Sequence, residues 1–372
     1  MVKQVPHRRV QLEVVLALVC IAPVWSVRPP GASLLAERAE DAGQACGQLP
    51  CSPCSALLEA NNCKWKFKQY IASELEEKWW QVVDRVGDNP CDAVRTTFAE
   101  YFARYKAAIH AGRLASNGVI AEGQCNCLKS AEPESFDQTV FSRFEYENEC
   151  TSEMAYSYIE PLAGILRHPE VCEHEKQNLL RKDWLLVDQW ALQKNRNLDS
   201  RFFYFDAGAS TWAEGLGGAS QAWFDSIYVN KCAPFQGYWL WEVLEQKPSK
   251  VFGALPARVK PNYHWYNIPA SQDKENSDSP LFHVRNTAQP QDFVVLKIDI
   301  DNNPVEEAMV YALLNDTHLL SLIDEFYWEH HINMYPMTKH WHDTISKTHK
   351  QKDSIMIFRK LREAGVRAHS WV

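Results

Sequence analysis

Four short apolar runs in the second half of the chain end at or just before an acidic residue, and this pattern restricts the fold more than any other feature. The runs are FFYF (202–205), YWLWE (238–242), DFVVLKIDID (292–301) and LIDEFYWEHH (322–331). Short apolar strands separated by helical stretches are typical of a mostly parallel sheet covered on both faces. The sequence therefore predicts an α/β fold for residues 201–372, closed by a helix and a last strand in SIMIFRKLREAGVRAHSWV.

The first half of the chain has a different pattern, in which apolar residues recur at helical spacing. This spacing predicts helices within 55–83, 94–109, 158–165 (broken at Pro161) and 175–192. We therefore expect an α-helical region over residues 46–200, ahead of the α/β domain at 201–372.

Cysteines are concentrated in the same region and predict structural disulfides in an oxidising compartment. Apart from Cys20, the cysteines are Cys46, Cys51, Cys54, Cys63, Cys91, Cys125, Cys127, Cys150, Cys172 and Cys232. The alternative is that CSPC (51–54) and CNC (125–127) form a zinc site or a redox pair. Spacing alone does not fix the pairing.

The N-terminus carries a basic stretch followed by an apolar one, which predicts a secretory signal peptide over residues 1–26. An uncleaved signal anchor is the alternative, and a membrane association is expected only in that case. Residues 27–45 have the Pro, Gly, Ala and charged composition of a linker. Together with the cysteines, this places the protein in the secretory pathway, either in the ER or Golgi lumen or secreted.

The net charge of −8 excludes a general nucleic-acid binder, because no basic stripe is present to displace the counterions of a polyanion. Ligands of open parallel sheets bind beyond the carboxyl ends of the strands. We therefore expect the catalytic or ligand-binding side chains at those ends.

A glycine-rich loop follows the first predicted strand, and an acid closes the second. The loop begins with Asp206, Gly208 and Ser210 in FDAGAS, and Glu242 ends YWLWE about thirty residues after the first strand. Nucleotide-binding α/β folds place an acid at this second position to hold two ribose hydroxyls. The dinucleotide fingerprint GxGxxG is absent from the chain, so NAD is not favoured.

With these motifs the chain resembles the S-adenosylmethionine-dependent methyltransferases, and more closely the FkbM-like branch, over residues 201–372. The resemblance rests on FDAGAS, WLWE, the Lys-Ile-Asp of DFVVLKIDID, and LIDEFYWEHH. It implies a Rossmann-like methyltransferase fold with S-adenosylmethionine as cofactor. It also implies that Asp206, Gly208 and Ser210 line the methionine and ribose side, that Glu242 binds the ribose, and that Asp299 lies near the transferred methyl group.

A hydroxyl acceptor would need a base, and four side chains at strand ends are candidates: Asp299, Asp301, Glu329 and His331. Side chains alternate along a strand, so Glu329 and His331 share one face and His330 lies on the other. Asp299, Asp301 and Glu329, with His331, alternatively hold a divalent cation such as Mg²⁺ or Mn²⁺.

These observations favour O-methylation of a small-molecule or glycan hydroxyl. One alternative is a secreted, non-catalytic binding protein on a degenerate methyltransferase scaffold, with the cysteine-rich helical region as a module for a protein partner. Another is a Golgi-type glycosyltransferase that uses Asp299 and Asp301 as a DxD metal site.

Overall fold

The computed structural model describes residues 63–112, 136–196, 199–214, 220–231, 233–341, 344–346 and 348–371. All of them belong to one compact unit that spans Ala45–Val372. The predictions for residues 1–45, for the later part of the glycine-rich loop (215–219), and for Cys46, Cys51, Cys54, Cys125, Cys127 and Cys232 lie outside the described residues.

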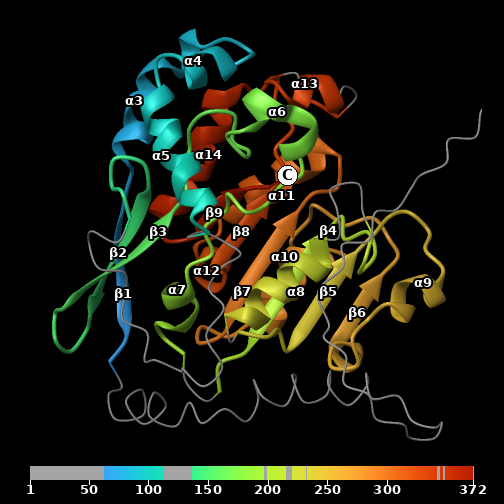
Figure 1. Cartoon of the computed structure of the whole chain (residues 1–372). Coiled ribbons are helices and arrows are strands. Elements are labelled where there is room, and N and C mark those ends of the chain that lie inside the picture. The colour runs from blue at the N-terminus through green and yellow to red at the C-terminus, as the bar shows by residue number, and fades with distance from the viewer. Residues whose placement is uncertain are drawn as a thin grey trace, which may run out of the picture. The chain divides into compact units, whose positions relative to one another are not determined.

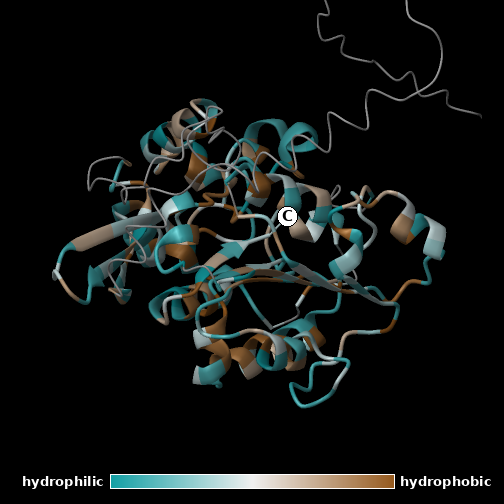
Figure 2. Cartoon of the chain, turned by 90° about the horizontal axis from the view of Figure 1, so that it is seen from below, coloured by the Kyte–Doolittle hydropathy of each residue, from teal (hydrophilic) through white to brown (hydrophobic). Residues whose placement is uncertain are grey.

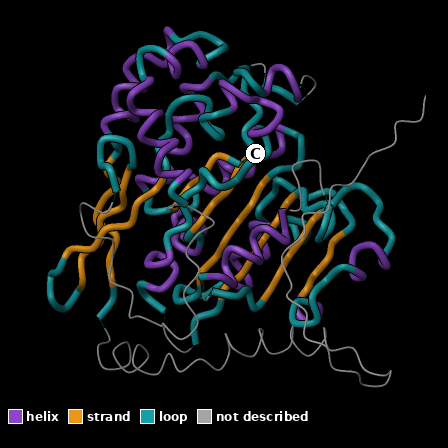
Figure 3. The backbone as a smooth tube through the Cα atoms, viewed as in Figure 1, coloured by secondary structure: helices purple, strands orange, loops and turns teal. Residues whose placement is uncertain are grey.

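A six-stranded parallel sheet forms the centre of the second half, in the order β6-β5-β4-β7-β8-β9. Figure 3 shows its strands side by side. The strands are β4 (Phe202–Ala207), β5 (Gly237–Trp241), β6 (Tyr263–Tyr266), β7 (Phe293–Ile298), β8 (Glu325–Trp328) and β9 (Arg367–Ser370). All four predicted apolar runs are confirmed as strands, as is the final helix followed by a strand. The α/β prediction is therefore correct, and the strand order is that of doubly wound nucleotide-binding sheets.

Helices cover both faces of this sheet, which is why its strands read as continuous apolar runs. Every residue of β4 and β7 is buried, and Figure 2, which views the sheet nearly edge-on, shows helices on either side. The helices of this half are α8 (Ser220–Asn230), α9 (Pro248–Gly253), η2 (Lys260–Asn262), α10 (Pro280–Thr287), α11 (Asn303–Leu314), α12 (Thr317–Leu322), α13 (Met337–His340) and α14 (Gln351–Glu363).

The first half contains a three-stranded antiparallel sheet that the sequence did not predict (Figure 1). Its strands are β1 (Trp65–Ile71), β2 (Ser142–Asn148) and β3 (Met154–Ile159). The helix predicted over 55–83 is therefore present only from Glu74 onward among the described residues, and the helix predicted over 158–165 was wrong. A spacing of four is also a multiple of the strand period of two, so Phe67 and Ile71 fit either structure, and pairing with β2 decides for the strand.

The other regular elements described in this half are helices. They are α3 (Glu74–Val82), η1 (Val83–Arg85), α4 (Cys91–Arg95), α5 (Ala99–His110), α6 (Val171–Asn178) and α7 (Gln189–Gln193). The helix predicted over 94–109 is present, with a break before α5. The helix predicted over 175–192 is instead two short helices joined by a partly buried loop, in which Leu185 to Val187 pack into the core and the Leu186 N–H donates to Glu160. The region is thus mixed in structure rather than purely helical.

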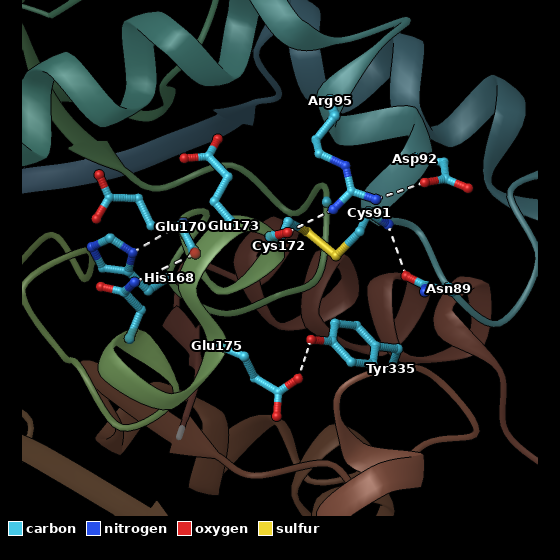
Figure 4. Close-up of a disulfide and its surroundings, with 12 residues drawn as sticks. Asn89, Cys91, Asp92, Arg95, His168, Glu170, Cys172, Glu173, Glu175 and Tyr335 are labelled. Carbon is cyan, nitrogen blue, oxygen red and sulfur yellow. Dashed lines mark hydrogen bonds and ion pairs between the residues drawn. A yellow bond between two sulfur atoms is a disulfide. The ribbon is translucent and has the colours of Figure 1, made fainter.

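Two disulfides connect distant segments of the first half, Cys63–Cys150 and Cys91–Cys172. The second joins α4 to α6, and beside it Arg95 donates to the Cys172 carbonyl oxygen over 2.6 Å (Figure 4). These bridges confirm the disulfide prediction for four cysteines and indicate an oxidising environment. Among the described residues, no helix is long and apolar enough to cross a membrane.

Removing the Cys91–Cys172 bridge with a Cys91→Ala/Cys172→Ala double substitution is expected to lower the free energy of unfolding by about 2–4 kcal/mol. The bridge closes a long loop, since its two cysteines are 81 positions apart in the sequence, and so restricts the unfolded chain. Urea unfolding measures the change, and peptide mapping checks that Cys63–Cys150 persists. Recovery of Cys91 linked to a cysteine other than Cys172 in the parent protein would contradict the assignment.

Candidate functional site

The side chains selected from the sequence all lie at or just beyond the carboxyl ends of four neighbouring strands. The strand order reverses between β4 and β7, because β5 and β6 extend the sheet on one side of β4 and β7 to β9 extend it on the other. Asp206 is the penultimate residue of β4 and its loop follows, Glu242 follows β5, Asp299 and Asp301 follow β7, and Glu329 and His331 follow β8. This edge is the position where open α/β sheets bind ligands.

A buried lysine connects the two central strands at this edge. Lys297 Nζ lies 2.9 Å from Asp206 Oδ1 and 3.0 Å from Asp299 Oδ2. Burial opposes the charge on Lys297, but the two carboxylates outweigh it and raise its pKa. Tyr204 donates to the other Asp206 oxygen over 2.6 Å, so both oxygens of this fully buried acid have protein partners. Asp206 therefore fixes Lys297 and has no surface to offer a ligand.

Gly208 is required by the close approach of the loop after β4 to the end of β7. Its φ is +85°, and a Cβ at this position would lie 1.6 Å from the Asp299 carbonyl oxygen. Its N–H and that of Ala209 both donate to the Trp241 carbonyl, over 3.0 and 2.9 Å. The glycine thus allows three strand ends to meet.

Glu242 holds two loops at the same edge. Its Oε2 accepts from the Ser210 N–H over 3.0 Å, and its Oε1 accepts from the Leu244 N–H over 2.7 Å. Ser210 has a positive φ of 53°, which turns this N–H toward the acid. Each carboxylate oxygen retains capacity for a second donor, such as a ribose hydroxyl.

A second group of charges surrounds Glu329, after β8. Arg167 Nη2 lies 2.5 Å from Glu329 Oε1, and His331 Nε2 lies 3.0 Å from Glu329 Oε2. Burial opposes ionisation of Glu329, but Arg167 and His331 lower its pKa to about 2. The opposite holds for Asp299, whose pKa is raised by burial and by the Glu329 charge despite the attraction of Lys297. The two neighbouring carboxyl groups thus have very different acidities.

The predicted cation ligands are only partly brought together. Asp301, Glu329 and His331 each place one ligand atom within 4.8 Å of the others. Asp299, by contrast, is held by Lys297. Two oxygens and one nitrogen fit a divalent cation, but Arg167 already supplies a positive charge at Glu329. His330 turns to the opposite side and stacks on Trp328, as the alternation of side chains predicts.

Two basic residues of the site come from the first half of the chain and were missed by the sequence analysis. Arg167 is buried, and within the described part of the chain its Nε and Nη1 have no hydrogen-bond partner. Lys182 Nζ lies 5.2 Å from the centre of the Trp371 ring, and burial together with the Lys297 charge lowers its pKa to about 8. Figure 1 shows α6, whose flanking loops carry both residues, beyond the carboxyl ends of the central strands. No local sequence pattern marks them, because their role arises from tertiary contact.

The fold and the site together define a doubly wound α/β protein with an acidic strand-end site that is closed by basic residues from an added region. Comparison with protein-family models, with curated proteins and with solved structures finds no match. The function must therefore be inferred from the site itself.

A Gly208→Ala substitution is expected to destabilise the protein by roughly 3 kcal/mol or more, because the added Cβ meets a backbone carbonyl and the positive φ is strained for alanine. The free energy of unfolding in urea measures the loss. Gly253→Ala is the matched control, since a Cβ there has no atom within 4 Å. Equal stability of the two variants would show that the strand ends do not approach as described.

Proposed function

We propose that this chain is an S-adenosylmethionine-dependent methyltransferase that methylates a hydroxyl of a small molecule or glycan within the secretory pathway. The observation that supports the proposal most is the meeting of the Gly208 loop, Glu242 and Asp299 at the point where the strand order reverses. The Rossmann-like methyltransferase fold is part of this proposal. The two disulfides support the secretory location.

The residues at this edge suit the parts of the cofactor. Glu242 is positioned for the ribose hydroxyls, with Ser210 beside it. A sulfonium next to Asp299 and Glu329 would have its charge compensated by carboxylates. Asp206 and Gly208 act indirectly, Asp206 by holding Lys297 and Gly208 by allowing the loop to close.

When bound, the sulfonium supplies an activated methyl group, so the protein mainly aligns the acceptor and removes its proton. Of the four candidate bases, Asp299 fits this role best, because burial and the Glu329 charge raise its pKa and so make its carboxylate a stronger base. Glu329 is a poor base, since its pKa is about 2 and Arg167 holds it. His331 lies against Glu329, and Asp301 is the most exposed of the four. Asp301 is therefore placed to contact the acceptor, whereas His331 is fully buried. No metal is needed for this step.

The two alternatives have less support from the geometry. A DxD site requires both acids to turn toward one metal, whereas Asp299 faces Lys297 and Asp301 lies toward His331, 3.8 Å away. One observation favours a binding protein without catalysis, namely that Asp206 and Glu242 are engaged in protein contacts. Direct measurement of ligand binding separates the three possibilities.

Calorimetric titration of the oxidised full chain is expected to show binding of S-adenosylmethionine and of S-adenosylhomocysteine. Glu242→Ala should weaken both by about 10- to 100-fold, the effect of losing hydrogen bonds to a charged group. Glu214→Ala is the control, because this acid lies on the Gly208 loop that Glu242 contacts but is paired with Lys250 at the surface. Binding of UDP-sugars instead, or of none of these ligands by folded protein, would refute the proposal.

The two adenosyl ligands should also differ in their pH dependence. Because the raised pKa of Asp299 leaves it protonated at low pH, the cationic sulfonium is expected to bind more tightly as pH rises and this acid ionises, while the neutral thioether is affected little. The measurement is the ratio of the two dissociation constants between pH 5 and 9, and Asp299→Asn should flatten it. A ratio independent of pH in the parent protein would remove Asp299 from the sulfonium.

A further inference from the structure

A second cluster of metal-binding side chains lies on the opposite side of β8 from the candidate site. It consists of Glu307 on α11, His330 after β8 and His349 just before α14, and each offers one ligand atom within 4.8 Å of the others. Consecutive residues on an extended segment point to opposite sides. His330 therefore belongs to this cluster, while His331 faces Glu329.

The three ligand atoms already converge. Glu307 Oε1 lies 3.3 Å from His330 Nε2 and 2.6 Å from His349 Nδ1. Ligand atoms of one tetrahedral ion with bonds of about 2.0–2.2 Å lie roughly 3.4 Å apart, so the first separation fits an ion, while the second is that of a hydrogen bond and must widen. A small movement of the Glu307 side chain would admit the ion.

The remaining nitrogen of each imidazole has a hydroxyl partner. His330 Nδ1 lies 3.1 Å from Ser354 Oγ on α14, and His349 Nε2 lies 3.4 Å from Tyr311 Oη on α11. Metal-bound histidines nearly always donate their other N–H to such a group, which fixes the ring and the tautomer. The His330 ring is further held by stacking on Trp328, with 3.9 Å between ring centres.

We propose that Glu307, His330 and His349 form a zinc site. Two imidazoles and one carboxylate favour Zn²⁺ over Mg²⁺ or Ca²⁺, which prefer oxygen ligands. The Glu307 and His349 side chains are each 18% exposed, so solvent reaches the site and a water completes the coordination. The ion would tie α11 and the start of α14 to the end of β8. The proposal does not depend on the methyltransferase function.

The test is zinc titration of the full chain, with its disulfides oxidised and its metals removed by a chelator, in competition with a chromogenic chelator. The parent protein is expected to bind one Zn²⁺ per chain at this site. His349→Ala and Glu307→Gln are each expected to lower the affinity for this ion at least about 100-fold. Ser354→Ala should weaken it about tenfold. His349 is chosen over His330 because it is partly exposed and its loss disturbs packing least.

His340→Ala is the matched control, since His340 also pairs with a carboxylate, Glu175 over 2.7 Å, but lies outside the cluster. Cobalt substitution gives an independent readout, a visible absorption band present in the parent and absent in His349→Ala. Unfolding temperatures in excess chelator check that the variants fold. The proposal is overturned if folded His349→Ala binds as much zinc as tightly as the parent, or if Asp301→Asn and not His349→Ala loses the ion.

Discussion

The arrangement of the strand-end site depends on one buried lysine. Lys297 sits between Asp206 at the end of β4 and Asp299 after β7, within 3.0 Å of each. Asp206 is buried and Asp299 is partly buried beside it, so the two acids would repel each other, and an uncompensated buried charge is costly. With Lys297 between them, the strand ends stay together and the Gly208 loop can close over them. The raised pKa of Asp299 follows from the same burial, with the nearby Glu329 adding to it.

A second buried cation makes the first half of the chain part of the same structure. Arg367 on β9 donates to Ser157 Oγ over 2.6 Å and to the Leu186 carbonyl over 2.9 Å. Lifting the 157–186 segment off the sheet would leave both Nη groups of this guanidinium unpaired, with its Nε still bonded to Glu325. The segment is therefore fixed where it brings Arg167 and Lys182 to the site. A region that the sequence analysis treated separately supplies part of the candidate chemistry.

The sequence was most informative where one element is buried on both sides. β4 and β7 are continuous apolar runs, and no other structure of that length explains them as well. The sequence pattern gave the wrong element where one face of a strand is exposed. In β1, for example, Phe67 and Ile71 fit a helix as well as a strand. The acids at the strand ends were found because each follows a run. Arg167 and Lys182 were not, because nothing near them in the sequence indicates their partners.

By itself, the sequence determined which segments form the parallel sheet and which polar residues follow its strands, because burial on both faces requires apolar runs and because parallel strands end at one edge. The tertiary structure decided what those residues do. Asp206 became a partner of Lys297, Glu329 became a partner of Arg167, and His330 turned away toward Glu307 and His349. The physical reason is that charge pairing in a buried site depends on distances of a few ångströms between segments far apart in the chain, and spacing along the sequence does not fix these distances.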